Sequence, residues 1–415
     1  MRILITGSAV YPAMNGQAVF TENLTEGLAQ RGNEVLSIFP SETGYAYQAI
    51  RNNVHIEALR SNNLNIIHAG VNFSFFSQNA IRRIIQSFRP EIVHVQDHYP
   101  NSLDTVRVAR QYKIHLIGTN HFMPENLASY VPGLSRFKPI YNWIGWTWML
   151  RTYNQLDVVT AQSKASTHLM RMNGLKIPAF AVSCGIDLKR FHPDPGLDRA
   201  AIRRRYGLNP DRKLLLFVGR LDPEKKIDVL LRAIKILNRE DIQLAIAGKG
   251  AAQKNLLDYT HDLGLDDNQV HFTGYIPAED LPAVLNSADI FCMPSEAELL
   301  SIASLEAMAC GKPVLLANAV ALPELVTEGV NGYLFRPGDA ADAARYMALL
   351  ADHPEKWARM SVSSLEKANY HSLENTVKQY ENIYNNLVAG VYSNPAQASI
   401  KTIPASTKRL VHNKK

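Results

Sequence analysis

The sequence predicts an α/β protein built from two Rossmann-like domains, each a doubly wound parallel sheet, that face each other across a cleft. Short β-rich segments alternate with amphipathic helical segments from the N-terminus onward, and the alternation starts again at residues 213–218. Strands that alternate with helices form parallel sheets joined by right-handed crossovers. The chain of 415 residues is long enough for two such domains, each with its own core.

The first domain is predicted to span residues 1–195. An amphipathic helix at residues 21–30 ends at Gly32, a typical C-terminal cap. A connector rich in proline and glycine, residues 185–196, leads out of the domain. The strands expected here cover residues 3–6, 34–39, 91–95, 115–118 and 158–161.

The second domain is predicted to span residues 205–370, with its first helix at 227–237. A further helix at residues 373–390 is expected to pack back against the first domain and complete it. Residues 393–415 are polar, contain proline and end in basic side chains, which predicts a disordered basic tail. The strands expected in this domain cover residues 213–218, 243–247, 269–273, 289–293 and 313–317.

The composition excludes several classes of protein. With 46% apolar and 20% charged residues the chain is typical of a soluble globular protein, and no segment is apolar over the ~20 residues that a membrane span needs. The net charge of +6 suits an anionic ligand or an anionic membrane surface and does not require nucleic acid. The three cysteines show neither metal-ligand spacing nor a disulfide pattern, so we expect a cytoplasmic protein: Cys184, Cys292 and Cys310.

Ligands of open α/β sheets bind beyond the carboxyl ends of the strands, and candidate residues follow two strands of the second domain. After residues 213–218, Gly219 permits a tight turn, and Arg220 and Lys225 can converge on a diphosphate. Two solvated surface charges would explain this segment equally well. After residues 269–273, the turn at 274–276 offers main-chain groups to a base edge, although an ordinary turn is the competing interpretation.

The segment 294–311 carries the strongest signal. It follows a strand, places Glu298 in a loop and Glu306 on a helix that ends at Gly311, and starts that helix near Ser301. Unpaired amides and the positive end of the helix dipole favour an anion there. Carboxylates that merely complement the dipole would explain Glu298, but they explain Glu306 less well in a small and apolar helix.

Taken in order, these segments resemble the retaining family 4 glycosyltransferases of the GT-B fold over nearly all of residues 1–390. The resemblance implies that Glu298 faces the donor sugar, that Glu306 binds the nucleotide ribose, and that Arg220 and Lys225 hold the diphosphate. It assigns catalytic roles to His121, Glu298, Arg220 and Lys225. It assigns donor binding to Gly16, Gly219, Gly274, Tyr275, Ile276, Leu299, Leu300, Ser301, Ile302 and Glu306.

Three positions depart from the family pattern. Ser301 stands where the family usually has glycine, Asn15 precedes Gly16 where it has a second glycine, and Lys226 follows Lys225 where it has glycine. Ser301 keeps its backbone amide but adds a side chain near the sugar pocket. Asn15 tolerates left-handed backbone better than most residues.

In the first domain, His121 follows a strand and is placed like the family's active-site histidine. A lone loop histidine is more often structural or exposed, so its position carries the argument. His98 is a second candidate for the cleft.

Residues 137–153 contain three of the four tryptophans, with Lys138 and Arg151 at the edges. Tryptophan favours interfaces that are apolar on one side and wet on the other. Membrane contact or a lipid-acceptor groove is one interpretation, and a helix packed in the core is the other. Together with residues 121–125 and 295–298, this segment also resembles family members that glycosylate diacylglycerol-type lipids, and attachment to a membrane would be peripheral.

The sequence therefore predicts transfer of a sugar from a UDP- or GDP-linked donor to a lipid or sugar acceptor, with retention implied by the resemblance. No Asp-x-Asp motif occurs, so we expect no metal requirement and no cofactor. A nucleotide-sugar epimerase or hydrolase on the same scaffold, a binding protein without activity, and a transferase with a soluble sugar or polyol acceptor remain alternatives. No G-x-G-x-x-G follows a first strand, which argues against a dinucleotide-dependent dehydrogenase.

Overall fold

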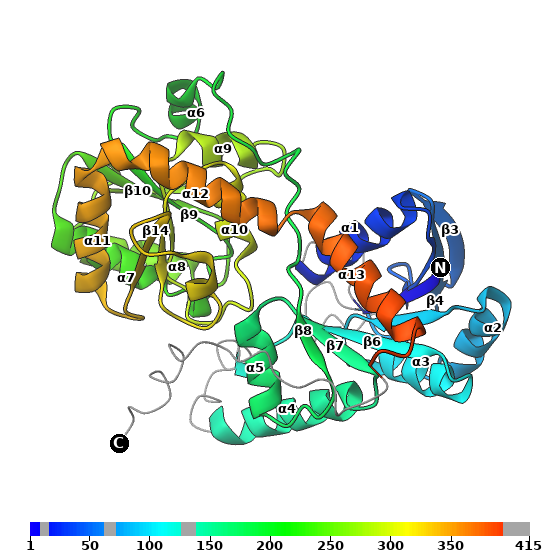
Figure 1. Ribbon diagram of the computed structural model, residues 1–415. Coiled ribbons are helices and arrows are strands. Elements are labelled where there is room, and N and C mark those ends of the chain that lie inside the picture. The colour runs from blue at the N-terminus through cyan, green and yellow to red at the C-terminus, as the bar shows by residue number, and fades with distance from the viewer. Residues whose placement is uncertain (9–15, 62–71, 126–137, 393–415) are drawn as a thin grey trace.

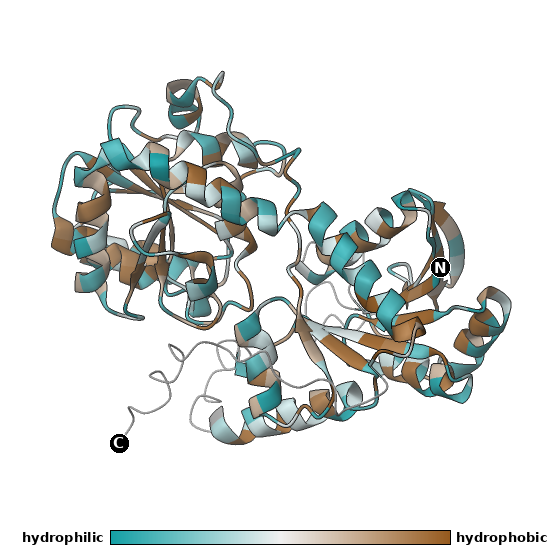
Figure 2. Ribbon diagram, in the orientation of Figure 1, coloured by the Kyte–Doolittle hydropathy of each residue, from teal (hydrophilic) through white to brown (hydrophobic). Residues whose placement is uncertain are grey.

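The computed structural model describes residues 1–8, 16–61, 72–125 and 138–392. It contains two α/β domains, each with one sheet flanked by helices (Figure 1). Figure 2 shows apolar strands at the centre of each domain and polar residues concentrated on the outer helix faces. The predicted fold class is confirmed. The tail at 393–415 and the loop that contains Asn15 lie outside the described residues.

The N-terminal domain holds an eight-stranded sheet in the order β3-β4-β2-β1-β5-β6-β7-β8, parallel except for the antiparallel pair β3–β4. Strand β1 lies at its centre, and Ile3, Leu4 and Ile5 are fully buried. A continuous apolar run is expected for a strand that is covered on both faces. The strands are β1 Arg2–Thr6, β2 Glu34–Pro40, β3 Tyr47–Arg51, β4 Val54–Leu59, β5 Ile92–Val95, β6 His115–Asn120, β7 Val158–Ala161 and β8 Ala179–Ala181.

Strands β3, β4 and β8 were not expected from the sequence. Strand β3 is an edge strand with a mostly exposed pattern, so it lacks the apolar run that marks the central strands. The hairpin turns at Asn52 and Asn53, whose φ angles are +49° and +62°. Two consecutive left-handed residues form a type I′ turn, for which asparagine is well suited. The adjacent Asn52 and Asn53 were the feature of the sequence from which this hairpin could have been predicted.

The N-terminal domain's helices cover both faces of its sheet (Figure 1). Helix α1 begins at Gly16, earlier than the predicted helix at 21–30, and Gly32 follows it with a φ of +83°. The helices are α1 Gly16–Gln30, α2 Gln78–Phe88, α3 Pro100–Gln111, α4 Lys138–Tyr153 and α5 Lys164–Met172.

The C-terminal domain holds a six-stranded parallel sheet in the order β11-β10-β9-β12-β13-β14. The strand order reverses at β9, which lies between β10 and β12, and such a switch point is where open α/β sheets bind ligands. The strands are β9 Lys213–Val218, β10 Ile242–Ala247, β11 Val270–Gly274, β12 Ile290–Met293, β13 Val314–Ala317 and β14 Gly332–Phe335. The helices are α6 Arg199–Arg205, α7 Ile227–Leu237, α8 Gln253–Asp262, α9 Leu281–Ser287, α10 Ile302–Ala309, α11 Ala340–Asp352 and α12 Trp357–Tyr370, with short 3₁₀ helices η3 Pro223–Lys225, η4 Leu322–Leu325 and η5 Pro354–Lys356.

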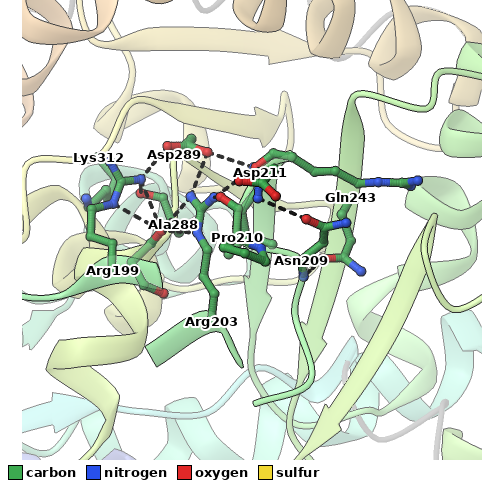
Figure 3. Close-up of polar contacts among 12 residues, drawn as sticks. Arg199, Arg203, Asn209, Pro210, Asp211, Gln243, Ala288, Asp289 and Lys312 are labelled. Carbon is green, nitrogen blue, oxygen red and sulfur yellow. Dashed lines mark hydrogen bonds and ion pairs between the residues drawn. The ribbon is translucent and has the colours of Figure 1, made fainter. Parts of the chain in front are cut away.

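Helix α6, which follows the connector, is held to the C-terminal sheet by an arginine and a carboxylate (Figure 3). The Arg203 guanidinium is 5% exposed and donates to the Ser287 carbonyl at 2.7 Å and to Asp289 at 2.8 Å. The same Asp289 oxygen accepts the Leu214 amide at the start of β9 at 2.7 Å. Charge-assisted bonds of this kind fix the chain where it enters the second domain.

Helix α13, Leu373–Val388, leaves the C-terminal domain and lies on the N-terminal one beside α1 (Figure 1). The Tyr384 hydroxyl lies 2.8 Å from Nδ1 of His94, on strand β5. The Tyr380 hydroxyl lies 3.0 Å from those of Thr119 and Thr160, on β6 and β7. The chain therefore crosses between the domains twice, and its last described helix is bonded to the first sheet.

Candidate donor-binding cleft

A cavity of about 300 Å³ lies between the carboxyl ends of the two sheets. Both domains supply its walls. Of the predicted site residues, it is lined by Gly16, His98, His121, Arg220, Lys225, Glu298, Leu299, Leu300 and Ile302. The predicted residues that do not line it are Gly219, Gly274, Tyr275, Ile276, Ser301 and Glu306.

A larger cavity, of about 620 Å³, lies between the β3–β4 hairpin and α2. It contains none of the predicted site residues and lies at an edge of the sheet. We take the smaller cavity as the candidate site, because it collects strand ends and charged side chains from two domains.

The two cationic side chains predicted to meet a diphosphate are already paired with carboxylates. Lys225 Nζ lies 2.6 Å from Glu298 Oε1, and these side chains are only 16% and 12% exposed. The Arg220 guanidinium lies 2.8 Å from the Asp222 carboxylate and 3.4 Å from that of Glu224, and the Arg220 side chain is 61% exposed. An incoming diphosphate would therefore compete with Glu298 for the Lys225 ammonium group.

Lys226 adopts the left-handed conformation, with a φ of +53° and a ψ of +38°. This is the position at which the family usually has glycine, which reaches that conformation without steric cost. Lys226 thus holds a backbone conformation that suits glycine, at the expense of local strain.

Helix α10 begins beside Glu298, and its start is capped by its own N-cap residue. Ser301 Oγ accepts the Ser304 amide at 3.2 Å, and Ser301 is 2% exposed. The hydroxyl is thus turned toward the backbone of the helix. Across the cleft, a Cβ added to Gly16 would lie 3.8 Å from Ile302 Cδ1, so the two domains approach closely here.

Glu306 lies on α10 and is largely enclosed, although it does not line the cavity. Burial raises the pKa of its carboxyl group to about 7, and the Arg190 guanidinium partly offsets this rise. A carboxyl group with this pKa changes its charge near neutral pH.

The turn at Gly274 is joined to Gly219 through a row of close backbone contacts. The Gly248 amide donates to the Gly274 carbonyl at 2.8 Å, and the Gly219 amide donates to the Ala247 carbonyl at 3.0 Å. A Cβ at Gly248 would lie 1.9 Å from the Gly219 oxygen, so only glycine fits there. Tyr275 is 52% exposed beside this row.

His121 is held between two glutamines. Its Nε2 lies 2.9 Å from Gln96 Oε1, and its Nδ1 lies 2.9 Å from Gln162 Nε2. With the amides assigned in this orientation, Nε2 carries the proton and Nδ1 accepts one. Burial lowers the pKa of His121 to about 3, so the ring is neutral at physiological pH. To contact a sugar through its ring, His121 must exchange one glutamine for the ligand.

The sequence analysis missed several residues of the cleft. Polar residues that directly follow strand β5 could have indicated some of them, because ligands bind at strand ends. Asp97 accepts hydrogen bonds from the Ser8 amide, from Gln17 Nε2 at 3.0 Å and from Ser102 Oγ at 2.6 Å. It thereby ties the end of β1 and the start of α1 to β5. Gln96, Gln162 and Glu224 also line the cavity.

Helix α4 buries one face of the tryptophan-rich segment and exposes the other. Trp146 is 3% exposed and donates to Glu125 Oε1 at 2.8 Å, on a face that also buries Met149. The opposite face carries an outward apolar stripe, defined as Ile140, Trp143, Ile144 and Trp148, with exposed fractions of 58%, 68%, 54% and 46%. The side chain of Lys138 lies outside the described residues.

Two further observations bear on membranes and metals. Over the described ranges, no helix combines the length and hydropathy that crossing a bilayer requires. The same residues contain no group of three histidine, cysteine, aspartate or glutamate side chains placed to hold a metal ion.

A second contact between the domains lies at the start of α5. The carboxylate of Glu324, in η4 of the C-terminal domain, accepts the Lys164 amide at 3.1 Å and the Ala165 amide at 2.7 Å. Ser166 Oγ donates to the Leu299 carbonyl at 3.0 Å. A carboxylate at a helix start is favoured by the free amides and the dipole.

Two family descriptions match the chain in tandem. Residues 14–190 match "Glycosyltransferase Family 4", and residues 198–365 match "Glycosyl transferases group 1". The boundary between the matches falls in the connector that leads to α6.

Curated relatives carry related names. A D-inositol 3-phosphate glycosyltransferase from Saccharomonospora viridis is 36% identical over 222 residues, covering 50% of each chain. A GDP-mannose-dependent alpha-(1-6)-phosphatidylinositol monomannoside mannosyltransferase from Mycolicibacterium smegmatis is 35% identical over 53% of this chain and 61% of its own. A GDP-mannose-dependent alpha-mannosyltransferase from Corynebacterium glutamicum is 27% identical over 80% and 76%. The chain thus matches only about half the length of the first of these.

Solved structures of low identity share the fold. Anabaena HepE in complex with UDP superposes with a TM-score of 0.74 at 18% identity, covering 93% of this chain and 100% of that one. Sucrose-phosphate synthase from Thermosynechococcus elongatus gives a TM-score of 0.72 at 19% identity, covering 94% and 100%. With its two matched domains and this architecture, the chain belongs to the GT-B glycosyltransferases of the family 4 type.

Proposed function

We propose that the protein transfers a hexosyl group from a nucleoside diphosphate sugar to a hydroxyl group, with retention of the anomeric configuration. One observation carries the proposal. The Lys225–Glu298 pair, at the start of α10, and the neutral His121 line one cavity from opposite domains. This arrangement supplies charge for a leaving diphosphate on one wall and a neutral polar group on the other.

The chemistry we assign to the site is stabilisation of the departing nucleotide. Negative charge on the diphosphate grows as the sugar leaves, and Arg220, Lys225 and the free amides at the start of α10 would bind it. Once Lys225 turns to the diphosphate, the Glu298 carboxylate is released to face the sugar. Because cationic side chains and a helix start take the part of a metal, we propose that neither a metal nor a cofactor is required.

The relatives suggest which substrates to test first. Two of them are named for dependence on GDP-mannose, and the names of two refer to inositol phosphate or phosphatidylinositol. We therefore propose a GDP-linked donor, with a UDP-linked one as the second candidate. The acceptor we propose is a membrane lipid with a polyol headgroup, with a diacylglycerol-type lipid or a free polyol as alternatives.

A membrane acceptor is supported by the position of α4. Its outward stripe presents tryptophan and isoleucine to solvent. Trp148, a member of the stripe, packs against His98 in the cavity wall, with the two ring centroids 4.5 Å apart. Peripheral, reversible attachment through this stripe would bring lipid headgroups to the cleft. The net charge of +6 would favour an anionic bilayer.

The first experiment is a thermal-shift screen of GDP, UDP and ADP, since a true ligand stabilises the folded protein by mass action. Transfer from the matching nucleotide sugar is then measured with and without acceptor, and the anomeric configuration of the product is read by NMR. An epimer or free sugar that forms at the full rate without any acceptor would contradict the transferase assignment. An inverted product would contradict retention alone.

Vesicle sedimentation tests the membrane surface separately. The double variant Trp143→Ser, Ile144→Ser should lose binding to anionic vesicles. The control Val362→Ser, which removes a 57% exposed apolar side chain from α12, should keep it. Equal binding by both variants would rule out the stripe as the contact surface.

A further inference from the structure

His98, three residues after β5, is an imidazole in the wall of the cleft that the protein itself leaves unpaired. It is 1% exposed, and it lines the cavity. Within the described ranges, neither its Nδ1 nor its Nε2 has a hydrogen-bond partner. Buried polar atoms are almost always paired, so two unpaired nitrogens on one ring indicate a partner from outside the chain.

Aromatic side chains enclose this ring. Trp148 meets it edge-on, with ring centroids 4.5 Å apart and planes at 84°, and Tyr99 and Phe122 lie at 4.9 Å and 5.6 Å. These neighbours pack around the imidazole, and none of them hydrogen-bonds to its nitrogens. The surrounding aromatic side chains therefore fix the position of the ring, while both of its nitrogens stay able to hydrogen-bond a ligand.

The surroundings also determine the charge of the ring. Burial lowers the pKa of His98 to about 4, although the neighbouring Asp97 carboxylate opposes this shift. A neutral imidazole offers one donor and one acceptor. That combination matches a hydroxyl group or two adjacent hydroxyls, whereas a phosphate group would call for donors alone.

The position of His98 places it on the acceptor side of the site. Gln96, two residues earlier, bonds His121 and has an unpaired Nε2 of its own among the described residues. The Lys225–Glu298 pair lies on the facing domain. Trp148 is the most exposed ring of the enclosure, at 46%, and belongs to the outward stripe of α4.

We propose that His98 binds the acceptor, with its imidazole hydrogen-bonded to the hydroxyl groups of a polyol that enters past Trp148. This assignment rests on the proposed glycosyltransferase function and specifies its acceptor subsite. The polyol is either free in solution or the headgroup of a membrane lipid, because both present the same hydroxyls.

The test compares two variants with the wild type. His98→Phe fills the aromatic enclosure but removes both nitrogens, and His98→Gln restores one donor and one acceptor. Transfer from GDP-mannose or UDP-glucose is measured to free myo-inositol, to phosphatidylinositol vesicles and to diacylglycerol vesicles with glycerol as the free counterpart. Binding of the nucleoside diphosphate and slow donor hydrolysis without acceptor are measured in parallel.

The expected result is a rise of about tenfold or more in the acceptor KM of His98→Phe, the scale of leaving a buried hydroxyl unpaired. Nucleotide affinity, donor hydrolysis and thermal stability should stay at the wild-type level, and His98→Gln should recover part of the acceptor KM. The acceptor KM should rise for the polyol that the wild type uses, whether it is free in solution or the headgroup of a lipid. Comparison of the free and the vesicle-bound acceptors identifies which of the two it is.

Other outcomes overturn the inference in distinguishable ways. An unchanged acceptor KM in His98→Phe would show that the ring only packs. Donor turnover by the wild type without transfer to any polyol would refute the polyol assignment. A wild type that neither binds a nucleoside diphosphate nor consumes donor would refute the proposed function itself, and this inference with it.

Discussion

Replacing Glu298 by glutamine should tighten nucleotide binding while it slows transfer. Glu298 Oε1 lies 2.6 Å from Lys225 Nζ, so a diphosphate must break this bond before it gains the ammonium group. A charge-assisted hydrogen bond withdrawn from water contributes about 1.5–3 kcal/mol. Exposures of 16% and 12% admit some solvent, and screening reduces the figure to ~1 kcal/mol.

A free-energy difference of ~1 kcal/mol corresponds to a dissociation constant lower by about fivefold. Glu298→Gln is nearly isosteric, and the neutral amide competes less strongly for Lys225. The turnover number should fall in the same variant, because the carboxylate expected to face the sugar is lost.

Titration calorimetry with the nucleoside diphosphate that stabilises the wild type measures the effect directly. Glu296→Gln is the matched control, since Glu296 lies two residues away and has no ion pair with Lys225 in the described part of the chain. If Glu298→Gln binds the nucleotide no better than the wild type and the control, the exchange of partners at Lys225 is wrong.

Three further outcomes are expected. Tyr384→Phe removes the partner of His94 Nδ1 in a fully buried site, and should cost about 1–3 kcal/mol of stability. Its melting temperature should fall, while that of Tyr370→Phe, altered at a 66% exposed side chain, should not. The pKa of Glu306, raised to about 7, means that the folded protein holds a proton there that the unfolded chain releases near the ordinary value of 4.5. The contribution of Glu306 to stability should therefore decline as pH rises from 4.5 through 7. Nucleotide affinity should instead rise through pH 7, because the carboxylate forms there. The variant Glu306→Gln should flatten both pH profiles. Finally, activity should survive EDTA, and complete loss that Mg²⁺ or Mn²⁺ restores would contradict the metal-independent assignment.

The central strands were predictable because burial on both faces requires an unbroken apolar run. Strands β9 and β10 lie within one residue of their predicted bounds. The edge hairpin β3–β4 was not predicted, because an exposed strand carries no such run. Helix α1 begins before its predicted start at residue 21, since small and polar residues blur a helix boundary.

Many of the residues that line the cleft could be named from the sequence, but their partners could not. Lys225 and Glu298 are 73 residues apart in sequence, and only the meeting of β9 and β12 in one sheet brings them together. The glutamines around His121 come from two different strand ends, and glutamine alone carries no recognisable motif. The roles assigned to the site residues, those of Glu306 and the turn at Gly274 included, stay predictions.

The carboxylate that binds two amides at the start of α5 belongs to the other domain, and this has a consequence for observing the enzyme in motion. Glu324 accepts the amides of Lys164 and Ala165, so these two hydrogens are protected only while the domains are together. When the domains part, the Lys164 and Ala165 amides lose this acceptor and meet water, whereas the Ser166 amide keeps its bond to Ser163 Oγ within the same domain. Deuterium uptake at these two positions, relative to the rest of the helix, would therefore serve as a built-in gauge of how often the cleft opens.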